Sequence, residues 1–214
     1  MNILFAGSPS MSAEILEHLV QNKDLNVITV LTQPDKRRKR GTGKHETPVS
    51  RVARKHSIKI LKPKTIDKTF VSTELSRSNI DLILVVAYGH ILPKEMLKIP
   101  KIMSMNIHFS LLPKYRGASP IQSAIINGDK KTGISFMKII EKMDAGELIY
   151  KADIKIDNKD TKTMLENKLT SLAISKMDGV LNSLKKNDYK LVEQNENDAS
   201  YCFKTVSYTH LTLP

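Results

Sequence analysis

Residues 2–31, NILFAGSPSMSAEILEHLVQNKDLNVITVL, hold two apolar runs separated by an amphipathic stretch. The runs at 2–6 and 27–31 are rich in aliphatic and β-branched residues, which is typical of strands buried on both faces. Between them, apolar residues recur at helical spacing: Ala13, Ile15, Leu16, Leu19 and Val20. Ser10 or Ser12 is available as the helix N-cap. The stretch therefore predicts a βαβ unit.

The same alternation continues through the rest of the chain. Further strands are expected at 58–61, 82–87, 102–110, 133–140 and 148–156, and helices at 47–56, 65–76, 121–127 and about 161–186. Strands that alternate with helices pair in parallel, and the helices cover both faces of the sheet. The predicted fold class is α/β, a Rossmann-like and mostly parallel sheet of six or seven strands covered by helices.

Composition narrows the possible classes of protein. The chain has 214 residues, 40% of them hydrophobic, which is enough for a buried core without disulfides. Its single cysteine, Cys202, fits a reducing compartment. No apolar stretch approaches the length of a membrane span and no signal peptide is visible, so we expect a cytoplasmic protein. The net charge of +12 favours a polyanionic partner or, alternatively, a lysine-rich solvated surface.

The sequence does not contain three common cofactor- or metal-binding motifs. The turn at 7–10, Gly-Ser-Pro-Ser, lacks the second and third glycines of a dinucleotide fingerprint. Gly43-Lys44 resembles a phosphate loop, but Arg38 occupies the position of the first glycine and His45 that of the hydroxyl residue. No HExxH arrangement is present, and no metal is expected.

The stretch 104–110, SMNIHFS, alternates strictly between polar and apolar residues. One face therefore carries four polar side chains, Ser104, Asn106, His108 and Ser110. An edge strand with a solvated face would explain this pattern. A central strand would have to bury that face at a cost, unless a cavity or a substrate accepted the polar groups. The conflict between fold class and pattern favours a functional role.

The residue types on this face suit acyl transfer. Asn106 offers a fixed N–H donor to a carbonyl oxygen, and His108 can exchange a proton near neutral pH. Asp144 lies between two expected strands and could provide a carboxylate partner, although an Asp before Ala-Gly is also a common turn residue. The loop at 110–120 exposes apolar Leu111 and Leu112 beside Lys114 and Arg116, a composition able to hold a flat anionic ligand.

Several stretches together resemble the methionyl-tRNA formyltransferase family. They are AYGHILP at 87–93, NIHFSLLPKYRGASPI at 106–121, MDAG at 143–146, FAGSP at 5–9 and TQPD at 32–35. The resemblance runs from Met1 to about Lys204 and covers the family's catalytic domain, which we place at 1–205. It implies formyl transfer from 10-formyltetrahydrofolate to the α-amine of methionyl initiator tRNA, in translation initiation and one-carbon metabolism.

Matched to the family's motifs, the catalytic residues are Asn106, His108 and Asp144. The resemblance also implies that two segments face the folate, with the residues Tyr88, Gly89, Ile91, Leu92, Ser110, Leu111, Leu112 and Pro113. From the motifs and the lengths of the apolar stretches we expect no metal and no membrane, and we expect a monomer. Members of the family also carry a C-terminal β-barrel that helps hold tRNA. Residues 206–214 lose the charge pattern of the chain, so they are interpreted as a truncated or foreign tail without that barrel.

Six positive side chains lie within the nine residues 36–44: Lys36, Arg37, Arg38, Lys39, Arg40 and Lys44. Like charges at this density repel one another, and contact with RNA phosphates would relieve the repulsion, whereas a solvated loop is the alternative. The resemblance implies that this loop enters the tRNA acceptor stem. Two other functions stay open. One is a formyltransferase that acts on an amino-sugar or a ribonucleotide amine, and the other is an inactive RNA-binding fragment.

Overall fold

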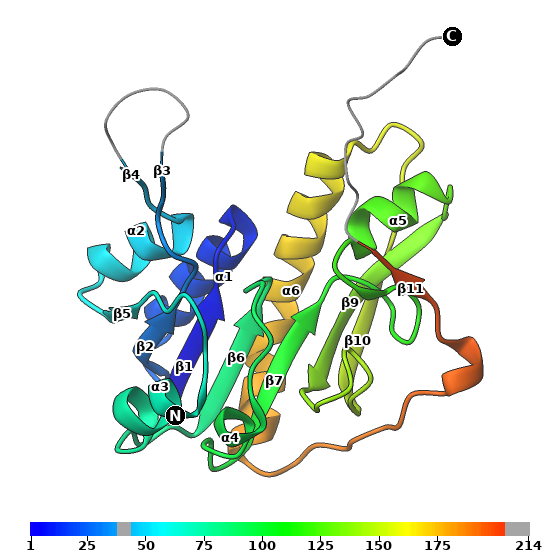
Figure 1. Cartoon of the computed structure of the whole chain (residues 1–214). Helices are drawn as coiled ribbons and strands as arrows, with labels where there is room; N and C mark the ends of the chain where they lie inside the picture. Colours follow the sequence, from blue (N-terminus) through cyan, green and yellow to red (C-terminus); the bar gives the residue numbers. More distant parts are fainter. Residues whose placement is uncertain (38–43, 204–214) are drawn as a thin grey trace, which may run out of the picture.

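A computed structural model describes residues 1–37 and 44–203 of the chain (Figure 1). Two sequence predictions lie outside the described residues. They are the middle of the basic run, Arg38, Lys39 and Arg40, and the interpretation of 206–214 as a tail. Every other candidate residue lies within the described part.

A seven-stranded sheet forms the centre of the fold, as expected. Its strands in spatial order are β10 (Leu148–Lys155), β9 (Lys131–Lys138), β7 (Met103–His108), β6 (Leu82–Val86), β1 (Asn2–Gly7), β2 (Asn26–Leu31) and β5 (Lys59–Leu61). The five strands from β7 to β5 are parallel, and β9 runs antiparallel to both β7 and β10. The carboxyl ends of the parallel strands therefore meet at one edge, the usual location of sites in α/β folds.

Helices cover both faces of the sheet because its strands are apolar on both sides (Figure 1). The larger core cluster joins one face to residues of α1 (Ser10–Gln21), α2 (Pro48–Lys55), α5 (Pro120–Ile126) and α6 (Lys162–Lys185). A smaller cluster joins the other face to residues of α4 (Lys94–Leu97) and of a helical segment made of α3 (Lys68–Phe70) and the π-helix η1 (Val71–Leu75). Because these helices are short, loops cover part of this second face.

Two local predictions differ from the structure. The N-cap of α1 is Pro9, without a side-chain cap, whereas Ser10 or Ser12 was expected. The Ser12 hydroxyl instead donates to the Val86 carbonyl at 2.6 Å, because this buried side chain faces the end of β6. The helix expected over 65–76 begins only at Lys68, after Asp67 caps it.

Short strands complete the fold at the edge where the parallel strands end. β3 (Lys36–Arg37) pairs antiparallel with β4 (Lys44–His45), and β8 (Arg116–Gly117) pairs in parallel with β11 (Tyr201–Cys202). A 3-10 turn, η2 (Glu196–Asp198), precedes β11. Within residues 1–37 and 44–203, no helix is both long enough and apolar enough to cross a membrane.

Candidate active site

The polar row lies on a central strand. β7 sits between β6 and β9, so the alternative of a solvated edge strand is wrong. Met105, Ile107 and Phe109 point into the larger core cluster, while Asn106 and His108 occupy the opposite face near the end of the strand. On the same face, the Ser104 hydroxyl donates to the Leu97 carbonyl of the short helix α4 at 3.4 Å. The partners of His108, in contrast, are Tyr115 and Asp144, which both lie in loops.

His108 is held between two oxygen atoms. Its Nε2 is 2.9 Å from the Tyr115 carbonyl oxygen, and its Nδ1 is 3.7 Å from Asp144 Oδ2. A carbonyl oxygen only accepts, so Nε2 carries the hydrogen in the first contact. At the second distance the two atoms are too far apart for a hydrogen bond. With an exposed fraction of 6%, His108 lies in surroundings that strengthen both interactions.

Asp144 reaches His108 from the connection between β9 and β10. Its Oδ2 accepts a hydrogen bond from the Gly117 amide at 2.8 Å. Its backbone is left-handed, with φ of 49°, a conformation that Asp tolerates better than most residues. Ala87 and Tyr115 also have positive φ values, 46° and 60°. Ser57 and Asn187 share this conformation just after α2 and α6, where left-handed residues often end a helix, whereas these three positions lie in loops that follow the strands of the sheet.

The structure brings His108 and Asp144 together and leaves the amide of Asn106 available. Asn106 pairs through its backbone with Val85 of β6 and Met137 of β9 and is half-buried. No hydrogen bond involves its side chain among the described residues. An amide donor and an imidazole–carboxylate pair thus line the same end of one strand.

The segment from Ser110 to Pro113 is only partly accessible. Ser110 and Leu112 are fully buried, and Leu112 packs with Met137 and Leu148 in a small separate cluster. Leu111 and Pro113 are half-buried and are the members of this segment able to meet a ligand.

Side chains from β9 and β10 hold this segment in place. The hydroxyl of Ser135 accepts from the Leu112 amide at 3.0 Å and donates to the Ser110 carbonyl at 2.7 Å. Lys151 donates to the Leu112 carbonyl at 3.1 Å. These three hydrogen bonds fix the backbone of the loop directly after β7.

The segment that follows β6 contains polar atoms without partners. Tyr88 is 2% exposed, and its hydroxyl finds no hydrogen-bond partner in the described part of the chain. Burial raises the pKa of Tyr88 to about 12. His90 Nε2 is likewise buried and unpaired, and the two rings lie 5.3 Å apart. Buried polar groups are normally satisfied, so both atoms are free to bond with a group from outside the chain.

His90 is a candidate that the sequence reasoning missed. It lies inside AYGHILP, but the residues chosen from that motif were Tyr88, Gly89, Ile91 and Leu92. Of these, Ile91 is 88% exposed and Leu92 belongs to the smaller core cluster. The ring nitrogens of His90 were the available signal.

The sequence suggested that Arg116 forms a basic rim on this loop, and the structure shows that it does not. Its side chain is fully buried, and its guanidinium binds Gln194 and Glu196. Lys114 pairs with Asp129 at 3.0 Å. The interpretation failed because acidic and amide partners reach this loop from distant parts of the chain.

Two further features concern possible ligands. The described ends of the basic run, Lys36–Arg37 and Lys44, lie in the short antiparallel pair of β3 and β4 that follows β2. Among the described residues, no group of three or more His, Cys, Asp or Glu side chains is arranged to hold a metal ion.

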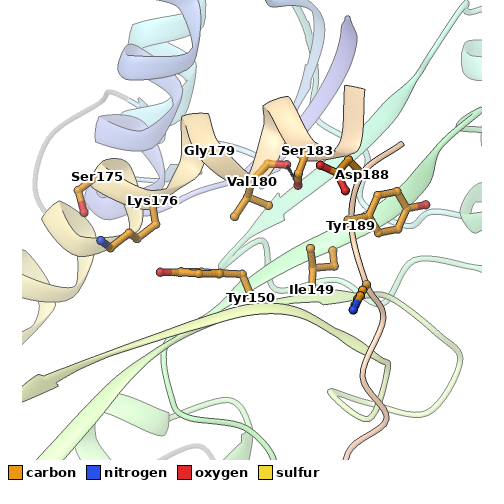
Figure 2. A pocket seen from close by; sticks show the side chains of 10 residues that line it. Ile149, Tyr150, Ser175, Lys176, Gly179, Val180, Ser183, Asp188 and Tyr189 are labelled. Carbon is orange, nitrogen blue, oxygen red and sulfur yellow. Dashed lines mark hydrogen bonds between the residues drawn. The ribbon is translucent and has the colours of Figure 1, made fainter. Parts of the chain in front are cut away.

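A cavity of about 380 Å³ lies between α6 and β10, lined by Tyr150, Lys176 and Tyr189 among others (Figure 2). None of the candidate residues lines it.

Comparison with known proteins relates this geometry to one family. The sequence profile described as "Formyl transferase" matches residues 1–181. The chain is 41% identical over 201 residues to a methionyl-tRNA formyltransferase of Thermotoga maritima, covering 94% of this chain and 64% of that protein. It is 40% identical over 204 residues to that of Halothermothrix orenii, covering 95% and 65%. The chain therefore spans somewhat less than two thirds of these relatives.

Solved structures agree on the fold. Phosphoribosylglycinamide formyltransferase from Anaplasma phagocytophilum superposes with a TM-score of 0.75 at 20% identity, covering 96% of this chain and 99% of that one. An N-formyltransferase from Helicobacter canadensis, solved with folinic acid and dTDP-3-aminofucose, gives 0.70 at 22% identity, covering 94% and 70%. At these identities the likeness concerns the architecture alone.

Proposed function

This chain belongs to the formyl transferase family, and from that premise we propose that it transfers a formyl group from 10-formyltetrahydrofolate to the α-amine of methionyl initiator tRNA. One observation carries the proposal. The buried His108 lies 3.7 Å from Asp144, beside the available amide of Asn106, at the carboxyl end of a central strand. The 41% identity to a methionyl-tRNA formyltransferase supports tRNA as the acceptor.

The segments expected to face the folate offer suitable chemistry. The unpaired Tyr88 hydroxyl and His90 Nε2 can exchange hydrogen bonds with a heteroaromatic ring, while Leu111 and the exposed Ile91 provide apolar contact. When bound, the folate supplies the formyl group and the nitrogen that leaves. The buried members of these two segments, Ser110, Leu112 and Leu92, do not reach the folate and instead support the segments from the protein interior.

Asn106 and His108 stabilise the charge that develops on the formyl oxygen. The Asn106 amide donates one hydrogen bond to that oxygen, and the Nε2 hydrogen of His108 donates a second. This hydrogen lies along the 2.9 Å line to the Tyr115 carbonyl in the structure. An oxyanion is a stronger acceptor than a neutral carbonyl and so competes for the same hydrogen.

Asp144 supports the proton transfer. The α-amine nitrogen forms a bond to the formyl carbon, the bond from that carbon to the folate nitrogen breaks, and one amine proton passes to the released nitrogen. The carboxylate of Asp144, 3.7 Å from Nδ1, orients the imidazole and accepts or relays this proton. No covalent intermediate with the chain is needed, and catalysis depends mainly on positioning.

The tRNA is held by the basic run from Lys36 to Lys44, with six cations. The described ends of this run, in β3 and β4, follow β2, a strand that runs parallel to β1 and β6 and so ends at the same edge of the sheet as β7. We assign residues 1–205 as the catalytic domain, and we place the reaction in the cytoplasm with the chain acting as a monomer. Because the relatives are longer, use of tRNA by this chain alone is part of the proposal.

A direct assay tests the donor and the acceptor together. The chain is incubated with 10-formyltetrahydrofolate and methionyl initiator tRNA, and formylmethionine is measured by mass spectrometry after the ester is hydrolysed. Parallel reactions offer glycinamide ribonucleotide, an amino-sugar nucleotide or no acceptor. We expect that, of these acceptors, only the charged tRNA is formylated. Transfer to one of the small amines would identify that amine, instead of tRNA, as the acceptor. If no folate-dependent turnover were found, the remaining function would be that of an RNA-binding protein.

A further inference from the structure

The chain after α6 returns to the site and lies along the loop that follows β7. In Figure 1 this segment runs from the end of α6 to β11. Val192 forms a bridge with Leu148, and Ser200 bonds with Pro113 and Arg116 through its backbone. β11 then pairs with β8, where a Cβ on Gly117 would lie 2.2 Å from the Cys202 carbonyl oxygen. This close approach joins two segments that are about 80 residues apart in sequence.

Arg116 is the centre of the contact. Its guanidinium is fully buried and forms a fork with Glu196, with bonds of 2.9 and 3.1 Å to the two carboxylate oxygens. Nε and Nη2 also donate to Gln194 Oε1, at 3.1 and 2.9 Å. Arg116 and, second, Lys142 lower the pKa of Glu196 to about 2. A buried guanidinium with this many partners has one orientation.

The orientation of Arg116 determines that of Gln194. Because the oxygen of the Gln194 amide faces the guanidinium, its nitrogen must point the other way. That nitrogen donates to the carbonyl oxygens of Asp144 at 2.9 Å and Gly146 at 2.7 Å. Turning the amide over would set its oxygen against both carbonyls and its N–H groups against the guanidinium. Gln194 therefore holds the backbone of the Asp144 loop in one place.

This loop requires such a restraint. Asp144 is left-handed, with φ of 49°, and a Cβ on Gly146 would lie 1.8 Å from the Lys138 carbonyl oxygen. Conformations of this kind persist only when surrounding contacts impose them. Lys142, on the same loop, adds a bond of 2.8 Å to Glu196. The segment after α6 therefore restrains the loop at three positions, 142, 144 and 146.

We propose that Gln194, oriented by Arg116 and Glu196, is a positioning residue that sets the Asp144 carboxylate against His108. Three consecutive residues carry the connection. The Tyr115 carbonyl binds His108, the Arg116 side chain binds Gln194, and the Gly117 amide binds Asp144. Gln194 does not touch the reacting atoms and acts through Asp144. The inference builds on the proposed function, since it deepens the role of Asp144, and it makes the segment after α6 a support of the catalytic residues.

Two substitutions test this role. Gln194→Ala removes the amide, and Gln194→Glu keeps its size but replaces the donor with an acceptor. Glu193→Ala is the matched control, because its neighbouring side chain is exposed and bonds to nothing in the described residues. We expect kcat to fall about 10- to 100-fold in both Gln194 variants, with the KM for folate within about twofold and no change in the control.

A second measurement does not depend on activity. The Gly117 amide bonds to Asp144 Oδ2, so its hydrogen exchange, followed by NMR, reports whether the carboxylate is in place. We expect exchange to accelerate at least about tenfold in Gln194→Glu and to stay unchanged in Glu193→Ala. Should the wild-type chain fail to formylate tRNA, this exchange still decides the positioning role, and only the proposed acceptor fails.

Introducing Gln194→Ala into an Asp144→Asn background separates positioning from general support of the fold. A residue that acts through Asp144 has little left to lose there, so kcat falls less than about twofold further. An equal fall in both backgrounds would overturn the proposal. So would wild-type Gly117 exchange in Gln194→Glu.

Discussion

Strands β6 and β7 lie side by side at the centre of one sheet, yet they have different tasks. β6 is apolar on both faces, with Leu82, Leu84 and Val86 in the larger core cluster and Ile83 in the smaller one. β7 contributes Met105 and Ile107 to the larger cluster but presents Asn106 and His108 on the other face. The comparison teaches that a central strand can give up one apolar face when loops, rather than a helix, cover it.

The substitution Leu84→Ala tests whether β6 contributes to stability and not to activity. Leu84 is fully buried in the larger core cluster, and a Leu-to-Ala change leaves a cavity. We expect a loss of about 3 kcal/mol in the free energy of unfolding, measured by urea denaturation. The kcat of the folded fraction stays close to that of the wild type, because the substitution faces away from the site. A loss of kcat without a loss of stability would contradict the division between the strands.

His108→Ala makes the opposite change on β7. Because proton transfer and oxyanion donors each contribute at this scale, we expect kcat to fall at least about a hundredfold. The unfolding transition is expected to stay near that of the wild type. A variant of clearly lower stability whose folded fraction keeps the wild-type kcat would instead identify His108 as a packed core residue. Measuring both quantities on the same preparation distinguishes the two outcomes.

The basic run extends the comparison to the surface. Replacing Arg37, Arg38, Lys39 and Arg40 with Ser is expected to raise the KM for tRNA about tenfold at low salt. Every cation–phosphate pair that the substitutions remove lowers the slope of log K against log salt by nearly one, so the salt dependence flattens. The KM for folate is unchanged, because folate is bound by short-range interactions. If tRNA affinity were unaltered at both low and moderate salt, the run would be a solvated loop.

Tyr88→Phe addresses the segment directly after β6 and has the smallest expected effect. Removing a buried hydroxyl without a partner is expected to stabilise the chain by about 1 kcal/mol and to raise the KM for folate a few-fold. Burial raises the pKa of Tyr88 to about 12, so the folded state retains a proton that the unfolded state loses. The contribution of Tyr88 to stability is therefore lost as pH rises from about 10 to 12, and the stability of the variant declines less steeply over this range. An unchanged KM would remove Tyr88 from the folate site.

Local pattern was sufficient for most of the fold. The period of two in 104–110 identified both faces of β7, and the apolar runs identified β1, β2 and β6, because such periodicities depend only on neighbours in sequence. The polar face of β7 pointed to Asn106 and His108 with Asp144 as a possible carboxylate partner, and family resemblance implied the same three residues. The structure brings His108 and Asp144 within 3.7 Å of each other. Their catalytic roles remain predictions.

Only the tertiary structure decided how the polar groups are paired. In the sequence, Arg116 looked like part of a basic rim, Gln194 carried no signal, and His90 was passed over. The fold places Arg116 against Glu196, Gln194 against Asp144, and His90 beside Tyr88 without a partner. Periodicity records which face of an element is buried, whereas a hydrogen bond between residues 80 positions apart depends on where the chain returns. The sequence alone therefore determined the main strands and helices and their buried faces, whereas the tertiary structure, above all the return of the chain after α6, determined the partners.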